Sequence, residues 1–106
     1  MAKYLIKASY TVEGTKGLLK EGGSSRRAVV EKMIQGLGGK LETFYYGFGE
    51  PDVFAVIDVP DATTAAAVSL AINSKGAVQV STTALITPEE IDEACKKSVA
   101  YRAPGT

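Results

Sequence analysis

The order of strand-like and helix-like segments leaves few folds open to this chain of 106 residues. Short β-rich runs that end in turn residues predict strands at residues 4–10, 41–48, 53–59 and 78–86. Apolar residues at helical spacing predict one main helix between the first and second strands and another between the third and fourth. The turn at residues 49–52 makes the second and third strands a hairpin. With right-handed crossovers, this order predicts an α+β fold of the ferredoxin-like βαββαβ type. It is a four-stranded antiparallel sheet with both main helices on one face.

Three of the expected helices begin with residues that can cap them. Ser24 and Ser25 precede an apolar pattern that ends near residue 37, and a short helical turn at residues 15–20 comes before them. Asp61 precedes an Ala-rich helix. Thr87-Pro88-Glu89-Glu90 has the pattern of a capping box and predicts an extra C-terminal helix that ends near residue 98.

The composition is that of an ordinary globular protein, with 45% hydrophobic and 23% charged residues. We therefore expect a single domain over residues 1–106, with a tail at about 99–106. Twelve basic residues balance twelve acidic ones, which argues against nucleic acid or a membrane surface as a partner. No apolar stretch has the length of a signal peptide or a membrane span, so we expect a cytoplasmic protein.

The chain contains no histidine and a single cysteine, Cys95. The commonest general base and the preferred zinc ligand are therefore missing, and no disulfide can form within the chain. We expect no metal and no cofactor. Cys95 falls in the middle of the expected C-terminal helix, where a buried, inert thiol is the default.

The predicted topology leaves one face of the sheet without helices, and strand alternation indicates which residues lie there. That face should carry many apolar side chains, and the residues expected at an interface are Leu5, Lys7, Phe44, Tyr46, Phe54 and Val56. Self-association would cover it, so we expect a homodimer or larger homo-oligomer. The alternatives are that water tolerates this face or that the C-terminal helix folds over it.

Polar residues near strand ends and loops are candidates for a ligand site, and these are Tyr10, Lys16, Arg26, Arg27 and Asp52. A tyrosine beside a lysine or arginine can act as an acid or hold an oxyanion, and glycines before Arg26 and Arg27 can leave room for an anion at a helix start. Taken singly, each residue also has a structural explanation in capping, packing or a turn.

Several short segments share a pattern that runs over nearly the whole chain: Ala8-Ser9-Tyr10-Thr11, Glu13-Gly14, Lys16-Gly17-Leu18, Gly22-Gly23-Ser24, Arg26-Arg27, Leu85-Ile86-Thr87-Pro88-Glu89-Glu90, Lys97-Ser98-Val99, Tyr101-Arg102 and Pro104-Gly105. Together they resemble the GYD domain family of small bacterial proteins. The resemblance implies a ferredoxin-like fold related to the dimeric α+β barrels, and it implies no particular function. The Gly-Tyr-Asp motif reads Gly49-Glu50-Pro51-Asp52 here, without the tyrosine.

Two functions follow as hypotheses. The first is a homo-oligomeric module that binds a small molecule or a protein partner without catalysis. The second is a small metal-free enzyme that resembles the monooxygenases and isomerases among the dimeric α+β barrels, which is an analogy of fold. An RNA-binding module of the same topology ranks last, because the net charge is zero and the first strand offers Leu5 and Lys7, with Phe54 on the third strand, where such domains stack bases on aromatics of both strands.

Overall fold

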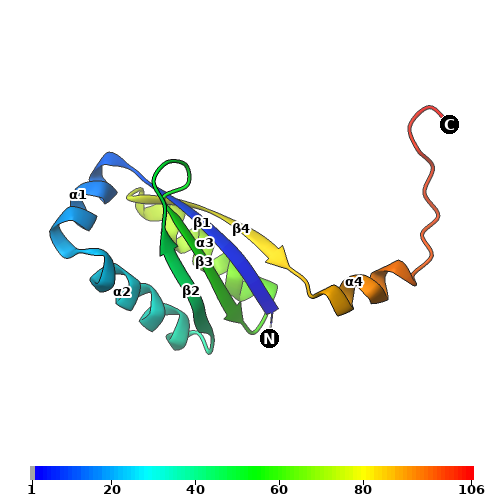
Figure 1. Ribbon diagram of the computed structural model, residues 1–106, viewed down its shortest axis with the longest axis horizontal. Helices are drawn as coiled ribbons and strands as arrows, with labels where there is room; N and C mark the ends of the chain where they lie inside the picture. The colour runs from blue at the N-terminus through cyan, green and yellow to red at the C-terminus, as the bar shows by residue number, and fades with distance from the viewer. Residues whose placement is uncertain (1) are drawn as a thin grey trace.

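The computed structural model describes residues 2–106 and contains a single four-stranded sheet with helices packed on one side (Figure 1). In chain order the elements are β1 (Ala2–Tyr10), α1 (Val12–Glu21), α2 (Gly23–Gly36), β2 (Lys40–Tyr46), β3 (Val53–Val59), α3 (Ala62–Lys75), β4 (Val78–Leu85) and α4 (Pro88–Cys95). The strand order is β2-β3-β1-β4, and all neighbours pair antiparallel. The predicted α+β ferredoxin-like fold is confirmed. The segment expected as a short turn at residues 15–20 belongs to a full helix, α1.

The core lies between the sheet and the two long helices. α2 packs on β2, α3 packs on β4 and β3, and the central strands β1 and β3 lie under the space between the helices. Three side chains are almost completely buried, Ile34 of α2 and Ile57 and Val59 of β3. The remaining buried members of this cluster are Tyr4, Ile6, Ala55, Ala65 and Val68.

Strict alternation in β1 and β3 sorts their side chains between two faces. The even positions Tyr4, Ile6 and Ala8 are buried under the helices, whereas Leu5 and Lys7 point the other way. In β3, Phe54 and Val56 lie on this second face too, as the sequence predicts. We call it the open face. Alternation and register give its members as Lys3, Leu5, Lys7, Ser9, Lys40, Thr43, Tyr45, Phe54, Val56, Asp58, Gln79, Ser81, Thr83 and Leu85.

The expected placement of Phe44 and Tyr46 on the open face is wrong. The register of β2 against β3 shifts between Leu41 and Thr43, so Glu42 is an extra residue on β2. A bulge of one residue moves everything beyond it to the opposite face. Phe44 and Tyr46 therefore lie on the helix-covered face, opposite Ala55 and Val53, with their rings 5.3 Å apart in an edge-to-face arrangement.

The helix starts follow the predicted caps in two cases out of three. The carboxylate of Asp61 accepts from the backbone N–H of Thr64 at 2.8 Å, and Thr87 and Glu90 form a complete capping box. The prediction that Ser24 and Ser25 cap α2 is wrong. α2 begins at Gly23, its N-cap is Gly22, and no side chain caps it.

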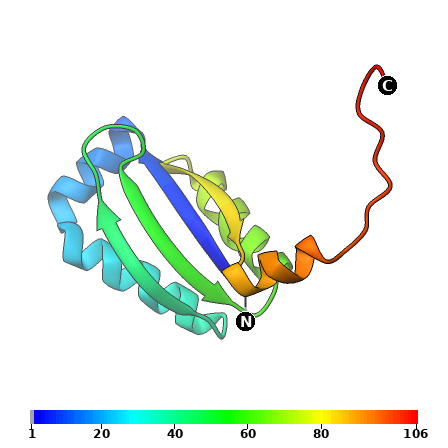
Figure 2. The same cartoon turned by 45° about the vertical axis from the view of Figure 1, so that its right-hand side comes forward.

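The chain beyond β4 leaves the domain. α4 and residues 96–106 extend away from the sheet, and the C-terminus lies far from the rest of the molecule (Figures 1 and 2). Every residue of this segment, which we call the arm (residues 86–106), is exposed. The expectation of a buried Cys95 is wrong, because the side chain is exposed. α4 also ends at Cys95, before the expected residue 98.

No helix within residues 2–106 has the length and apolar character needed to cross a membrane.

Candidate functional site

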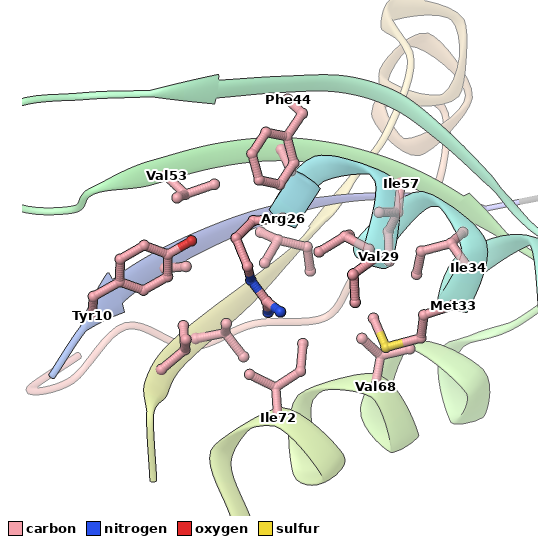
Figure 3. Close-up of a pocket in the computed structure, with 16 residues that line it drawn as sticks. Tyr10, Arg26, Val29, Met33, Ile34, Phe44, Val53, Ile57, Val68 and Ile72 are labelled. Carbon is pink, nitrogen blue, oxygen red and sulfur yellow. The ribbon is translucent and has the colours of Figure 1, made fainter. Parts of the chain in front are cut away.

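A cavity of about 110 Å³ lies between the sheet, α2 and α3 (Figure 3). Apolar side chains of all three form most of its wall. The lining residues are Ile6, Ala8, Tyr10, Arg26, Val29, Val30, Met33, Ile34, Phe44, Val53, Ala55, Ile57, Val68, Ile72, Val78 and Val80. Protein interiors are otherwise packed as closely as organic crystals, so a space of this size is a feature of the molecule that needs a cause.

The cavity arises where the two helices leave the centre of the sheet uncovered. α2 lies over β2 and α3 lies mainly over β4, so between them the floor is made by β1 and β3. At that floor the side chains of Ala8 and Ala55 are small. Side chains from both helices, including Val29 and Ile72, form the walls without filling the space.

Two of the lining side chains are polar, Tyr10 at the end of β1 and Arg26 in α2, and both extend toward the space in Figure 3. The Arg26 side chain is 31% exposed, and its Nη1 lies 3.8 Å from Oε2 of Glu21. That pair is long and partly open to solvent, so it binds the guanidinium only weakly. The guanidinium thus has donors left for a ligand at an otherwise apolar site.

Tyr46 lies beside these two residues and connects β2 to the start of α2. Its hydroxyl donates to the backbone oxygen of Gly23 at 3.1 Å. Burial, together with the neighbouring Tyr10 hydroxyl, raises the pKa of Tyr46 to about 12, whereas Arg26 acts in the opposite direction. Tyr46 is therefore a neutral hydrogen-bond donor at physiological pH.

Asp52 has its carboxylate engaged in the fold. Its Oδ2 accepts from the backbone N–H of Tyr10 at 2.8 Å, and its own N–H donates to the oxygen of Ala8 at 2.8 Å. The side chain thus replaces a ladder partner at the point where β1 runs past β3. It fixes the backbone of Tyr10 and does not line the cavity.

The other sequence candidates lie apart from the cavity. Lys16 of α1 and Arg27 of α2 are exposed, and Arg27 faces a shallow groove along β2 beside Glu31. Of the five predicted ligand residues, the structure brings Tyr10 and Arg26 together at one cavity. Tyr46 was expected at an interface, and its place beside these two depends on the bulge in β2.

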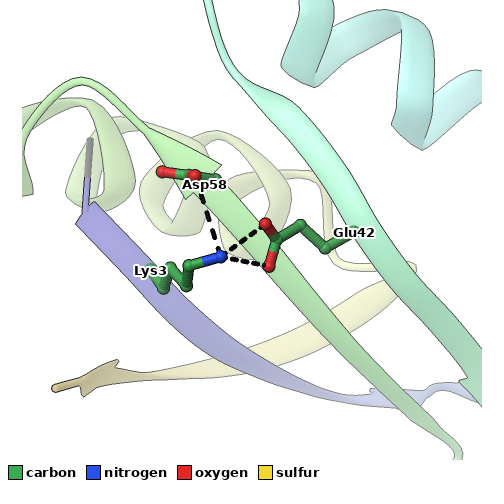
Figure 4. A network of polar contacts seen from close by, with 3 residues as sticks. All are labelled: Lys3, Glu42 and Asp58. Carbon is green, nitrogen blue, oxygen red and sulfur yellow. Dashed lines mark hydrogen bonds and ion pairs between the residues drawn. The ribbon is translucent and has the colours of Figure 1, made fainter. Parts of the chain in front are cut away.

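A charged cluster on the open face was not expected from the sequence (Figure 4). The ammonium group of Lys3 donates to Oε1 of Glu42 at 2.8 Å and lies 4.0 Å from Oδ2 of Asp58. The hydrogen bond to Glu42 is the main cause that raises the pKa of Lys3. The bulge that turns Phe44 inward also places the Glu42 carboxylate over the neighbouring strands, so pattern reading along β2 alone would not find it.

Among residues 2–106, no group of three or more Cys, Asp or Glu side chains is arranged to hold a metal ion.

Comparison with known proteins identifies the family of the chain and no individual relative. Neither the curated proteins nor the solved structures include a match to it. The model of the GYD domain matches residues 4–95, which is most of the chain and covers every element from β1 to α4. The chain therefore belongs to the GYD domain family.

Proposed function

We propose that this protein binds a small, mainly apolar molecule that carries one anionic group, in the cavity between the sheet, α2 and α3. The observation that carries the proposal is the composition of the cavity wall. The 16 lining residues include a single charged side chain, Arg26, and one further polar side chain, Tyr10. Ligand sites are typically apolar concavities with a few polar groups that fix orientation.

The residues that line the cavity determine the binding free energy of such a ligand. Apolar surface removed from water contributes about 25 cal/mol per Å², and the lining offers that surface on every side. A cavity of this order of size accommodates a single aromatic ring or a short aliphatic chain. A carboxylate next to the Arg26 guanidinium forms charge-assisted hydrogen bonds, which are about twice as strong as neutral ones. Tyr10 can donate a further hydrogen bond.

The direct test compares benzoate with its neutral analogue benzamide by calorimetry or ligand-observed NMR. We expect benzoate to bind more tightly. The Arg26→Leu variant should lose at least about tenfold in benzoate affinity, because a charge-assisted hydrogen bond contributes about 1.5–3 kcal/mol, and should change benzamide binding little. Arg27→Leu is the matched control, since Arg27 is the next residue on the same helix and does not line the cavity.

Two results would contradict the proposal. One is equal binding of benzoate by the wild type and by Arg26→Leu, and the other is equal weakening by Arg26→Leu and Arg27→Leu. Native mass spectrometry of the protein as purified provides a second test, and we expect bound mass on the wild type that a cavity-filling variant, Ala55→Leu, lacks.

The alternative is a metal-free enzyme of the monooxygenase or isomerase type. The cavity lining favours binding, because it includes no carboxylate, lysine or cysteine, which are the residue types of this chain most often used as catalytic bases or nucleophiles. The two functions separate in one experiment. A bound molecule recovered with unchanged mass and structure after long incubation supports binding, and a converted molecule supports catalysis.

A further inference from the structure

We propose that the arm (residues 86–106) packs on the open face of a second copy of this chain, and that two copies exchange their arms reciprocally to form a dimer. The inference is independent of the cavity, which lies on the opposite face of the sheet. Three observations support it: every residue of the arm is exposed, the arm extends away from its own sheet, and its chemistry complements that of the open face.

The arm carries apolar side chains that its own chain leaves exposed. Ile86, Val99 and Tyr101 are 57%, 80% and 75% exposed, and Ile91 in the middle of α4 is 45% exposed. The radius of gyration is 16.8 Å, against about 13 Å for a compact domain of this length. A helix as short as α4 (eight residues) is marginal in water by itself, so its apolar side needs a surface to pack on.

The capping box fixes the first turn of α4, which follows β4 closely. Only Ile86 and Thr87 separate β4 from α4. The backbone N–H of Thr87 donates to Oε1 of Glu90 at 2.9 Å, and the Glu90 N–H donates to Oγ1 of Thr87 at 3.0 Å. These bonds lie within the arm itself, and the arm extends away from the sheet of its own chain (Figure 2).

The open face offers the matching chemistry. Its centre is apolar, with Leu5 and Val56 half-buried, Phe54 40% exposed and Tyr45 69% exposed. Lys7 lies within this patch and forms no ion pair among residues 2–106, whereas Lys3 is already paired with Glu42.

On α4, Ile91, Ala94 and Cys95 share one side at i, i+3 and i+4, and acidic residues flank them. Glu89 and Asp92 form no ion pair within the part of the chain that the structure describes. The apolar stripe of α4, with its acidic borders, is thus complementary to the apolar patch of the open face, which contains a lysine. Because each copy has one arm and one open face, reciprocal exchange closes a two-fold dimer and leaves neither surface exposed.

The first test measures mass in solution by light scattering over a dilution series. We expect a dimer for the wild type and at least a tenfold higher dissociation constant for Ile91→Asp. Leu19→Asp is the matched control, because Leu19 is an apolar residue on another helix, α1, and is 82% exposed. A wild type that stays monomeric across the series overturns the proposal, as does an equal effect of the two substitutions.

The second test identifies the contact with the lone thiol of the arm. Wild-type chains, which carry Cys95, are mixed with size-tagged Cys95→Ser chains that carry Thr43→Cys on the open face. We expect a disulfide-linked pair of unequal chains under mild oxidation, well above the yield with Cys95→Ser, Lys16→Cys chains. Lys16 is an exposed residue of α1 and serves as the control position.

A yield no higher than that of the Lys16→Cys control overturns the exchange. A chain that carries both Cys95 and Thr43→Cys tests whether the arm contacts the open face of its own chain. If it forms an internal disulfide at a rate independent of dilution, the arm lies on its own sheet and the proposal is wrong.

Discussion

At the scale of single residues, Gly14 in α1 lies where a backbone carbonyl leaves no room for a side chain. A Cβ on Gly14 would lie 2.0 Å from the oxygen of Ala77. The same oxygen accepts from the N–H and the hydroxyl of Thr11, which caps α1. The segment before β4 and the start of α1 therefore meet through one carbonyl, and this contact places Tyr10 at the end of the cavity.

We predict that Gly14→Ala destabilises the protein by more than about 2 kcal/mol, because the backbone must move and the Thr11 hydrogen bonds are disturbed. Gly17→Ala, one turn further along α1, is the control. A Cβ there meets nothing within 4 Å, and alanine in a helix is worth about 0.5–1 kcal/mol over glycine. Urea denaturation measures both. Equal effects of the two substitutions would show that the contact with Ala77 does not hold α1.

At the scale of elements, the start of α2 depends on β2. α2 has no side-chain cap, and the Tyr46 hydroxyl donates to the first carbonyl of the helix, that of Gly23. The ring of Tyr46 also lies close to Gly23, where an added Cβ would come within 3.0 Å of it. Arg26 is one turn into the same helix, so this contact determines where the guanidinium enters the cavity.

This contact predicts a specific pH dependence. Burial raises the pKa of Tyr46 to about 12 from its ordinary value near 10, so the folded state favours the neutral phenol. The corresponding stability is complete below about pH 10 and is lost as the pH rises toward 12. We expect the difference in unfolding free energy between the wild type and Tyr46→Phe to be constant below pH 10. Above it, that difference should shift against the wild type. The lysines also titrate there, but they are common to both proteins. A difference that stays constant up to pH 12 would contradict the assignment.

How far the sequence predicted the fold also differs by element. The faces of β1 and β3 were predicted correctly because both strands alternate without interruption and each buried residue is apolar. β2 was misread beyond Leu41, because strict alternation was assumed, whereas the bulge at Glu42 puts both Leu41 and Phe44 on the helix-covered face. The cap of α2 was misread because Ser24 and Ser25 are good capping residues, whereas the helix begins earlier at Gly23.

The site was predictable only in part for a related reason. Tyr10 and Arg26 were recognised as polar residues near strand and helix ends. Their shared cavity depends on the distance between α2 and α3, which no local pattern encodes. Val29, Met33 and Ile72 have the helical spacing of ordinary core residues, and in the structure they line the space.

At the scale of the whole molecule, the arm makes the single chain longer than its fold requires, with principal extents of 55 × 34 × 23 Å. We predict that the Ile91→Asp variant, studied when dilute, keeps a radius of gyration near 16.8 Å by small-angle X-ray scattering. A chain that ends at Thr87 should scatter as a compact domain, with a radius of about 12 Å. A value near 13 Å for Ile91→Asp would mean that the arm folds back on its own domain.

The alternation of β1 and β3 also has a consequence for how such a sequence can change over time. The even-numbered positions of β1 face the cavity and core, and the odd-numbered positions face the open side. Adjacent residues of this strand are therefore under different selective pressures. If both proposals hold, substitutions at neighbouring codons can change the ligand without changing the dimer, or change the dimer without changing the ligand.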